Sequence, residues 1–298
     1  MALFGRRRAN SPDDDPTTNI VALAQLRLSA HGITTHVAEG TSGVDTVLVD
    51  EQGRAFPLRN LMAHLVSLSP ETDEYQEYLM THVDSIVAAM AEPPATELSD
   101  AEWFNRVRIR VLPSDARDEL PAHYAQTVTP ELIAVLCIDN PTSITFVKDA
   151  DLAGRDVRAS FDAGFRNVMA EPIDENAEVA PGVQLLAGES IFIASKVVGI
   201  ASLIGTVLPE APNGVIVGVP FRNVLFAHVV TGAASVGSIG ELAGMVARGA
   251  SDDAPSGPLS ASIYYWRDGV FENIGGPDST GKIHIRPSDR LMAVLNAD

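Results

Sequence analysis

Apolar residues recur every three or four positions between Tyr75 and Met90, which is the spacing of one face of an α-helix. Ser69 is a suitable N-cap, Pro70 is tolerated at the first helical position, and Pro93-Pro94 interrupts the pattern. We therefore predict a helix over residues 70–91. Its apolar stripe comprises Tyr75, Tyr78, Leu79, His82, Val83, Ile86, Val87 and Met90.

We expect this stripe to be buried within the same chain, because the strands predicted over 33–58 and 106–112 need a cover. His82 lies on the stripe. We interpret it as a core or boundary histidine, since an apolar stripe at helical spacing is typical of packing rather than of ligand binding.

Two further patterns predict strands of different kinds. Residues 107–112 alternate apolar and basic side chains, which indicates a half-buried strand with Arg108 and Arg110 on its solvent face. Residues 132–139 are apolar almost throughout, which is typical of a central strand covered on both faces. A turn then leads to a partner strand at 143–147.

The rest of the chain divides into short helices and strands. Helices are expected over 19–30, 60–68, 154–170, 197–208 and 239–248, and the third places Val157, Phe161, Phe165 and Val168 on one face. Strands are expected over 33–37, 44–50, 55–58, 191–194, 215–219, 224–230, 261–266, 270–274, 282–285 and 291–295. Because strands come in hairpins and helices in blocks, we predict an α+β fold with mainly antiparallel sheets and covering helices.

Residues 171–183 are the predicted boundary between two subdomains, because they hold two prolines, four acidic residues and few large apolar side chains. The prediction is a disordered tail over 1–18 and α+β subdomains over 19–172 and 183–298. The order of elements in the first subdomain is one helix, three strands, a helix, two strands and a helix. This order is similar to the folds of small secretion chaperones.

Composition narrows the classes of partner. Of the 298 residues, 46% are hydrophobic, which is enough for a substantial core. The formal net charge is −18, from 39 acidic and 21 basic residues. The surface of such an acidic protein repels phosphate backbones, so we expect no nucleic-acid partner. The cluster Arg6-Arg7-Arg8 is short, and Asp13-Asp14-Asp15 soon follows it.

The single cysteine and the apolar runs bear on the compartment. Cys137 has no partner for a disulfide within the chain, and we interpret it as a buried hydrophobe rather than a nucleophile. No signal-peptide pattern follows Arg8. The apolar run at 197–208 has 12 residues, whereas about 20 are needed to cross a bilayer. We therefore predict a cytoplasmic protein without a transmembrane segment.

Residues 276–282 have the spacing of a phosphate-binding loop that ends at Lys282. Such a loop needs a serine or threonine after the lysine and a helix that begins there. Ile283 follows instead, within a strand pattern. We therefore predict a polar hairpin loop without a bound nucleotide.

Other candidate motifs have structural explanations too. Residues 237–240 follow a strand, but Ser238 and Glu241 match a capping box. Residues 188–192 resemble a nucleophile elbow that lacks its last glycine. No metal-binding spacing occurs among the histidines, which are His31, His36, His64, His82, His123, His228 and His284. The sequence thus predicts no catalytic, cofactor-binding or metal-ligating residue.

Three stretches in a fixed order carry a family resemblance. They are residues 106–113 with 132–139, the helix that holds Phe161 and Phe165, and residues 215–227 followed by 264–269. Together they resemble the YtpQ-like family of bacterial proteins, a domain of unknown function, over residues 19–275. The resemblance implies an α+β cytoplasmic protein and supplies no catalytic residue.

The leading functional hypothesis is a protein-binding or adaptor module with a chaperone-like role. One alternative is an enzyme whose site is assembled from distant segments, and another is a peripheral membrane protein guided by residues 1–8. An apolar groove or an exposed sheet would favour binding, whereas a deep pocket of converging polar groups would favour an enzyme. The oligomeric state is left open.

Overall fold

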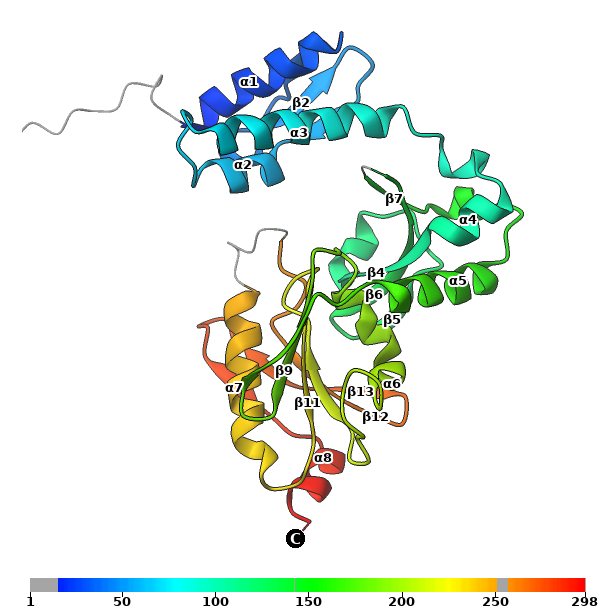
Figure 1. The fold of residues 1–298 in the computed structure, drawn as a ribbon, viewed down its shortest axis with the longest axis vertical. Coiled ribbons are helices and arrows are strands. Elements are labelled where there is room, and N and C mark those ends of the chain that lie inside the picture. Colours follow the sequence, from blue (N-terminus) through cyan, green and yellow to red (C-terminus); the bar gives the residue numbers. More distant parts are fainter. Residues whose placement is uncertain (1–15, 142, 251–256, 298) are drawn as a thin grey trace, which may run out of the picture. The chain divides into compact units, whose positions relative to one another are not determined.

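A computed structural model describes residues 16–141, 143–250 and 257–297 (Figure 1). The chain forms two compact units, residues 1–92 and 93–298. Within the described residues, eight α-helices and three antiparallel sheets confirm the predicted α+β class. None of the helices in that part combines the length and apolar character of a bilayer span. Residues 1–15 of the predicted tail lie outside the described residues.

The first unit is a three-stranded sheet covered by helices. Its elements are α1 (Pro16–Ala30), β1 (Thr35–Val37), β2 (Val47–Asp50), β3 (Ala55–Pro57), α2 (Arg59–Leu65) and α3 (Asp73–Met90). The strands lie in the order β1-β2-β3. Leu48 and Phe56 pair across β2 and β3, and both side chains are buried in the core of this unit.

The α3 stripe is buried within its own chain, as its periodicity predicts. Tyr75, Leu79 and Val83 pack in one cluster with residues of α1, α2 and the sheet. The strand at 106–112 belongs to the second unit, whereas the cluster that holds the stripe consists of residues of the first unit. The stripe therefore contributes to the core of the first unit.

α3 begins at Asp73 rather than at residue 70. The hydroxyl of Thr72 accepts a hydrogen bond from the Tyr75 N–H at 3.3 Å, so Thr72 is the N-cap. His82 is half-buried, and its ring centroid lies 5.9 Å from that of Tyr78, which stacks on His64 at 3.8 Å. The interpretation of His82 as a core or boundary residue is confirmed.

The second unit contains two sheets with their helices. Its helices are α4 (Asp100–Arg106), α5 (Val157–Ala170), α6 (Ile200–Leu203), α7 (Ser235–Gly249) and α8 (Asp289–Leu295), with a 3-10 helix at Ala194–Gly199. The strands of the smaller sheet are β4 (Val107–Pro113), β5 (Gln126–Thr129), β6 (Leu132–Asp139) and β7 (Ile144–Phe146). Those of the larger sheet are β8 (Glu175–Ala180), β9 (Val183–Ala187), β10 (Val215–Gly218), β11 (Val224–Val229), β12 (Ile263–Arg267), β13 (Val270–Pro277) and β14 (Ile283–Ile285).

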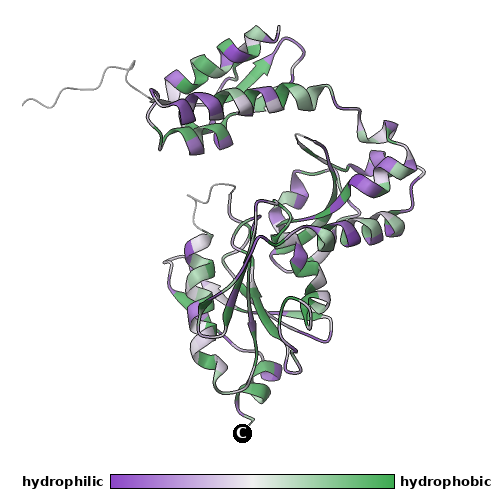
Figure 2. Ribbon diagram, viewed as in Figure 1, coloured by the Kyte–Doolittle hydropathy of each residue, from purple (hydrophilic) through white to green (hydrophobic). Residues whose placement is uncertain are grey.

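β6 is the central strand of the smaller sheet, with β4 on one edge and both β5 and β7 on the other. The larger sheet has the order β14-β13-β12-β10-β11-β9-β8. α5 packs on β4, and α7 packs across the larger sheet. Hydrophobic residues are concentrated in the central strands (Figure 2). β6 is buried from Leu132 to Ile138, as its apolar run predicts.

The boundary between the compact units differs from the predicted one. It follows Glu92, and residues 171–183 lie inside the second unit. There β8 pairs with β9, and β9 pairs with β11 of the larger sheet. Val111 and Leu132 of the smaller sheet share a core cluster with Leu186 of β9, so both sheets belong to one unit. The polar composition of 171–183 reflects an exposed edge strand, β8, rather than a linker.

Arg110 is buried, which contradicts its predicted place on a solvent face. It is 6% exposed, its guanidinium donates a hydrogen bond to the Ile191 carbonyl, and it lies 5.8 Å from the centroid of the Phe192 ring. Burial lowers the pKa of Arg110 to about 10. The covering segment comes 81 residues later in the chain, so local alternation does not reveal it. Arg108 is half-buried and bonds Glu171 at 3.0 Å.

Two predicted strands are not strands. Residues 191–193 form a turn, and Ala194 begins the 3-10 helix. The predicted helix over 197–208 is limited to the end of that 3-10 helix and α6. Residues 291–295 lie in α8, where the Ser288 hydroxyl accepts from the Leu291 N–H at 3.2 Å. No pattern in the sequence predicted α4, β5, β8 or β9.

Candidate functional site

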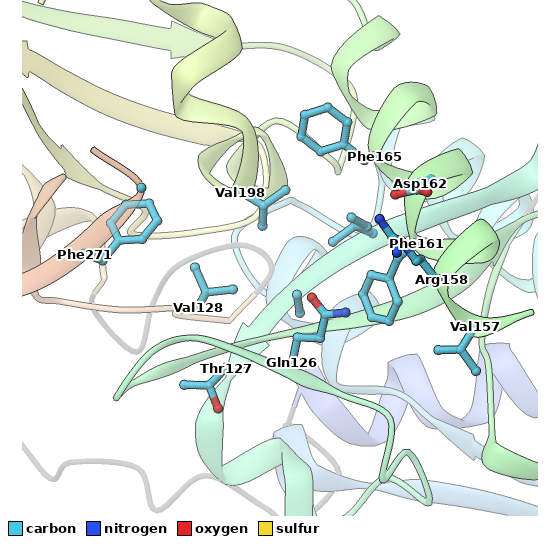
Figure 3. A pocket seen from close by; sticks show the side chains of 13 residues that line it. Gln126, Thr127, Val128, Val157, Arg158, Phe161, Asp162, Phe165, Val198 and Phe271 are labelled. Carbon is cyan, nitrogen blue, oxygen red and sulfur yellow. The ribbon is translucent and has the colours of Figure 1, made fainter. Parts of the chain in front are cut away.

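A groove of about 620 Å³ opens on the second unit between α5, β5, the 3-10 helix and the hairpin of β12 and β13 (Figure 3). Its apolar lining comprises Ile109, Val128, Ala134, Val157, Phe161, Phe165, Val198 and Phe271. Its polar lining comprises Gln126, Thr127, Arg158 and Asp162. Val157 is 37% exposed, and Phe165 and Phe271 are half-buried, so the groove presents apolar surface to solvent.

α5 forms one wall of the groove because it sits close to β4. Asp156 caps the helix by accepting a hydrogen bond from the Ala159 N–H at 3.1 Å. A β-carbon at Gly164 would lie 3.2 Å from backbone atoms of Arg108 and Ile109, so the glycine permits the close approach. α5 therefore covers β4, while the surface over β5 and the start of β6 forms part of the groove.

β5 is the edge strand beside the groove. It pairs with β6, and Gln126 lies opposite Ala134, so both residues are on the face toward the groove. The hydroxyl of Tyr124 accepts a hydrogen bond from the Leu136 N–H at 3.2 Å and donates one to the Val147 carbonyl at 2.7 Å. These bonds fix the chain immediately before β5, and with it the floor of the groove.

The 3-10 helix is held in place by a buried lysine. The Lys196 ammonium donates hydrogen bonds of 2.9, 3.0 and 2.7 Å to the carbonyls of Val168, Met169 and Glu171. These carbonyls lie at the end of α5, so the ammonium caps that helix, and burial lowers the pKa of Lys196. The Ser195 hydroxyl accepts from the Val111 N–H at 3.0 Å. Together these bonds position Val198 on the groove wall.

Arg158 and Asp162 lie one turn apart on α5, at the rim of the groove (Figure 3). Both are exposed, and neither forms an ion pair with another described residue. Arg155 is different, because its guanidinium binds Asp100 at 2.9 Å and lies over the Trp103 ring, 4.3 Å from the ring centroid. The rim charges are therefore available to a ligand.

The chemistry of the lining is suited to binding. It provides apolar surface, one amide, one hydroxyl and two charged groups. The lining residues include no histidine or cysteine that would pair with the Thr127 hydroxyl as a base. Across the described residues, no three His, Cys, Asp or Glu side chains are grouped so as to hold a metal ion. The arrangement resembles sites that take an apolar group between a few orienting polar ones.

The residues singled out from the sequence lie elsewhere. Cys137 is fully buried, as predicted, and burial raises the pKa of its thiol to about 12. The Ser190 hydroxyl donates to Glu171 at 2.8 Å, and a turn rather than a helix follows Ser190, so residues 188–192 are not a nucleophile elbow. α7 begins at Ser235, and the Ser238 hydroxyl donates to a carbonyl of another segment at 2.6 Å. The predicted capping box is therefore wrong.

Residues 276–282 contribute to the hairpin between β13 and β14, as predicted. The Asp278 carboxylate accepts hydrogen bonds from the N–H groups of Thr280 at 2.8 Å and Lys282 at 3.1 Å, and it lies 2.8 Å from the Nε2 atom of His284. Hydrogen bonds, first that of the Thr280 hydroxyl, hold the pKa of Asp278 well below its usual range. The N–H groups of Thr280 and Lys282 thus bind the side chain of Asp278 within the loop itself.

Sequence periodicity placed Val157, Phe161 and Phe165 on one face of a helix, and this face forms one wall of the groove. Phe161 is buried, whereas Val157 and Phe165 border the open groove. Phe271 and β5 were missed as site elements, because β5 is short and its exposed residues are polar. Only the contact between distant segments reveals the site.

The family resemblance read from the strand cores and turns stays a prediction, and the groove is the feature on which a functional proposal rests. Comparison with protein-family models, with curated proteins and with solved structures finds no match to this chain.

Proposed function

We propose that the second unit is a protein-binding module whose groove receives apolar side chains of another protein. The observation that carries the proposal is the exposed apolar surface of Val157, Phe165 and Phe271 around a hollow of about 620 Å³. Covering such surface contributes about 25 cal/mol per Å² to association. The charges at the rim, Arg158 and Asp162, would orient the partner.

The open shape of the groove favours a protein segment over an enclosed small ligand. Sites for small molecules surround most of the ligand surface, whereas this groove is open to solvent along α5. The net charge of −18 also favours partners with basic surfaces. We propose an adaptor or chaperone-like role in the cytoplasm on this basis.

A photo-activated cross-linker tests the proposal in the native host. We would place p-benzoylphenylalanine at Val157 and, as a control, at Val236, which is 61% exposed in the first turn of α7. We expect a discrete protein adduct from position 157 and none from 236, detected by mass spectrometry. Equal adducts at both positions, or a small molecule retained by the purified protein in native mass spectrometry, would contradict the proposal.

A further inference from the structure

The smaller sheet of the second unit is partly uncovered on the side of the groove. α5 packs chiefly on β4, and the groove floor includes Ala134 of β6 and Gln126 of β5. The sheet is three strands wide at any level, because β5 and β7 pair with the same edge of β6, and three strands spaced by about 4.8 Å span about 10 Å between the outer strands. α5 lies over β4, the outer strand on one side, so the strip of this face over β5 is left to the groove alongside α5.

The flank of α5 that faces the groove carries a row of side chains suited to helix packing. Val157, Phe161 and Phe165 are four residues apart, and such rows interdigitate with a second helix at an interaxial distance of about 8–10 Å. The row extends over about 12 Å, roughly two helical turns. Val198 and Phe271 form the opposite wall (Figure 3). A helix in this channel would meet apolar surface on both sides.

An extended segment fits this site less well. It would bind by adding a strand to the free edge of β5. The pairing of β5 with β6 shifts register between Thr127 and Thr129, and an irregular edge of this kind disfavours the addition of another strand. The groove over the sheet face, rather than the strand edge, is the surface that remains for a partner.

The charge of the protein favours basic residues on the polar face of a helix bound in the groove. A chain with a net charge of −18 attracts a basic helix and repels an acidic one at long range. At the rim, the exposed carboxylate of Asp162 is placed to meet a lysine or arginine, and Arg158 one turn earlier is placed to meet a single acid or a backbone carbonyl. The two rim charges are of opposite sign, so the net negative charge of the whole chain decides the preference for a basic over an acidic helix.

We infer that the groove binds an amphipathic helix of a partner protein, laid alongside α5. Its apolar face carries large residues three and four apart, and its polar face is rich in lysine or arginine. This inference rests on the proposed function, because the groove must first be a site for protein segments.

Three fluorescent peptides of about 16 residues, long enough to form a helix when bound, test the inference. The first has leucines at helical spacing and lysines on its polar face, the second has glutamates in place of the lysines, and the third is the lysine peptide with two central prolines. Fluorescence anisotropy with the full chain measures binding. We expect both the glutamate and the proline peptides to bind at least about tenfold more weakly than the lysine peptide.

Variants of the full chain locate the site. Val157→Asp should weaken binding of the lysine peptide by about tenfold or more, because it places a carboxylate in the apolar wall. Val236→Asp is the matched control, since Val236 is also an exposed valine in the first turn of a helix, and it should bind like the parent. Circular dichroism verifies that both variants are folded.

The outcomes separate the inference from the function on which it rests. Equal binding of the proline and lysine peptides, with both weakened by Val157→Asp, would overturn the helix and leave the groove a site for extended segments. Tighter binding of the glutamate peptide would overturn the charge preference. Absence of any effect of Val157→Asp on every peptide would overturn the groove as a protein-binding site.

Discussion

α3 in the first unit and α5 in the second both carry an apolar face at helical spacing, but the two faces meet different surroundings. On α3, Tyr75 is 1%, Leu79 3% and Val83 1% exposed. On α5, Phe161 is 8% exposed, whereas Val157 is 37% exposed at the groove. Periodicity thus shows which face of a helix requires a cover, but not whether the chain itself supplies all of it.

The largest effect is expected from a charge in the α3 stripe. Leu79→Asp places a carboxylate in a core without a partner, at a cost of several kcal/mol, which approaches the whole stability of a domain. We expect insoluble protein or a first unit that limited proteolysis cleaves readily. Ile86→Asp should be milder, because Ile86 is half-buried.

Leu79→Met serves as the control, because a swap of similar volume costs less than about 1.5 kcal/mol. A Leu79→Asp protein that melts like the parent would show that the α3 stripe is an interface rather than a core. The contrast between α3 and α5 would then disappear.

The elements that the sequence predicted well are those whose burial is reflected in the local pattern of apolar residues. β6 is apolar almost throughout because it is covered on both faces, and α3 repeats its apolar residues because one face packs. α8 was mistaken for a strand. A pattern of five residues, 291–295, is too short to distinguish the helical spacing of apolar residues from the alternation of a strand. β8 was taken for a linker because both its faces are largely exposed and its residues are polar.

The groove was not predictable, because its parts come from distant segments. Ile109, Phe161 and Phe271 meet only in the folded chain, and each has an ordinary local pattern. The same holds for Arg110, which is buried by the segment at Ile191 and Phe192. Local alternation places a side chain on a face of a strand, whereas tertiary structure decides whether that face meets water.

A second test concerns the wall of the groove formed by α5. Lys196→Met keeps the length of the side chain and removes three hydrogen bonds to the final carbonyls of α5. At about 1 kcal/mol for each lost bond, we expect a loss of about 3 kcal/mol in the free energy of unfolding, measured in urea. Lys282→Met, at an exposed lysine in a hairpin, should stay within about 0.5 kcal/mol. Equal midpoints for the two variants would refute the capping role of Lys196.

A third test uses pH. The Nδ1 atom of His228 lies 2.7 Å from the Gly182 carbonyl, its buried Nε2 atom has no hydrogen-bond partner among the described residues, and burial lowers the pKa of His228. Because the unfolded chain has a histidine pKa of about 6.5, it takes up the proton first as the pH falls. The contribution of His228 to stability is therefore full above about pH 6.5 and declines below it.

We expect the melting temperature to be lower at about pH 5.5 than at about pH 7.5, and the difference to shrink in His228→Gln. Burial also lowers the pKa of His82 on α3, so the first unit should weaken in the same direction. An unchanged difference in His228→Gln would assign the pH dependence to other groups.

The smallest effect on stability is expected for Val157→Asp, which compares the apolar face of α5 directly with that of α3. Val157→Asp adds a carboxylate to the first turn of α5, where the side chain already meets solvent and the helix dipole favours a negative charge. We expect the free energy of unfolding to change by no more than about 0.5 kcal/mol, as for Val236→Asp in the first turn of α7. The same substitution type at Leu79 should cost several kcal/mol, so the pair measures how far each stripe is covered by its own chain. A loss of more than about 2 kcal/mol in Val157→Asp would mean that the groove edge is part of the core, and that α5 resembles α3 after all. A negligible loss would show that this end of the α5 stripe is left apolar for a reason other than folding.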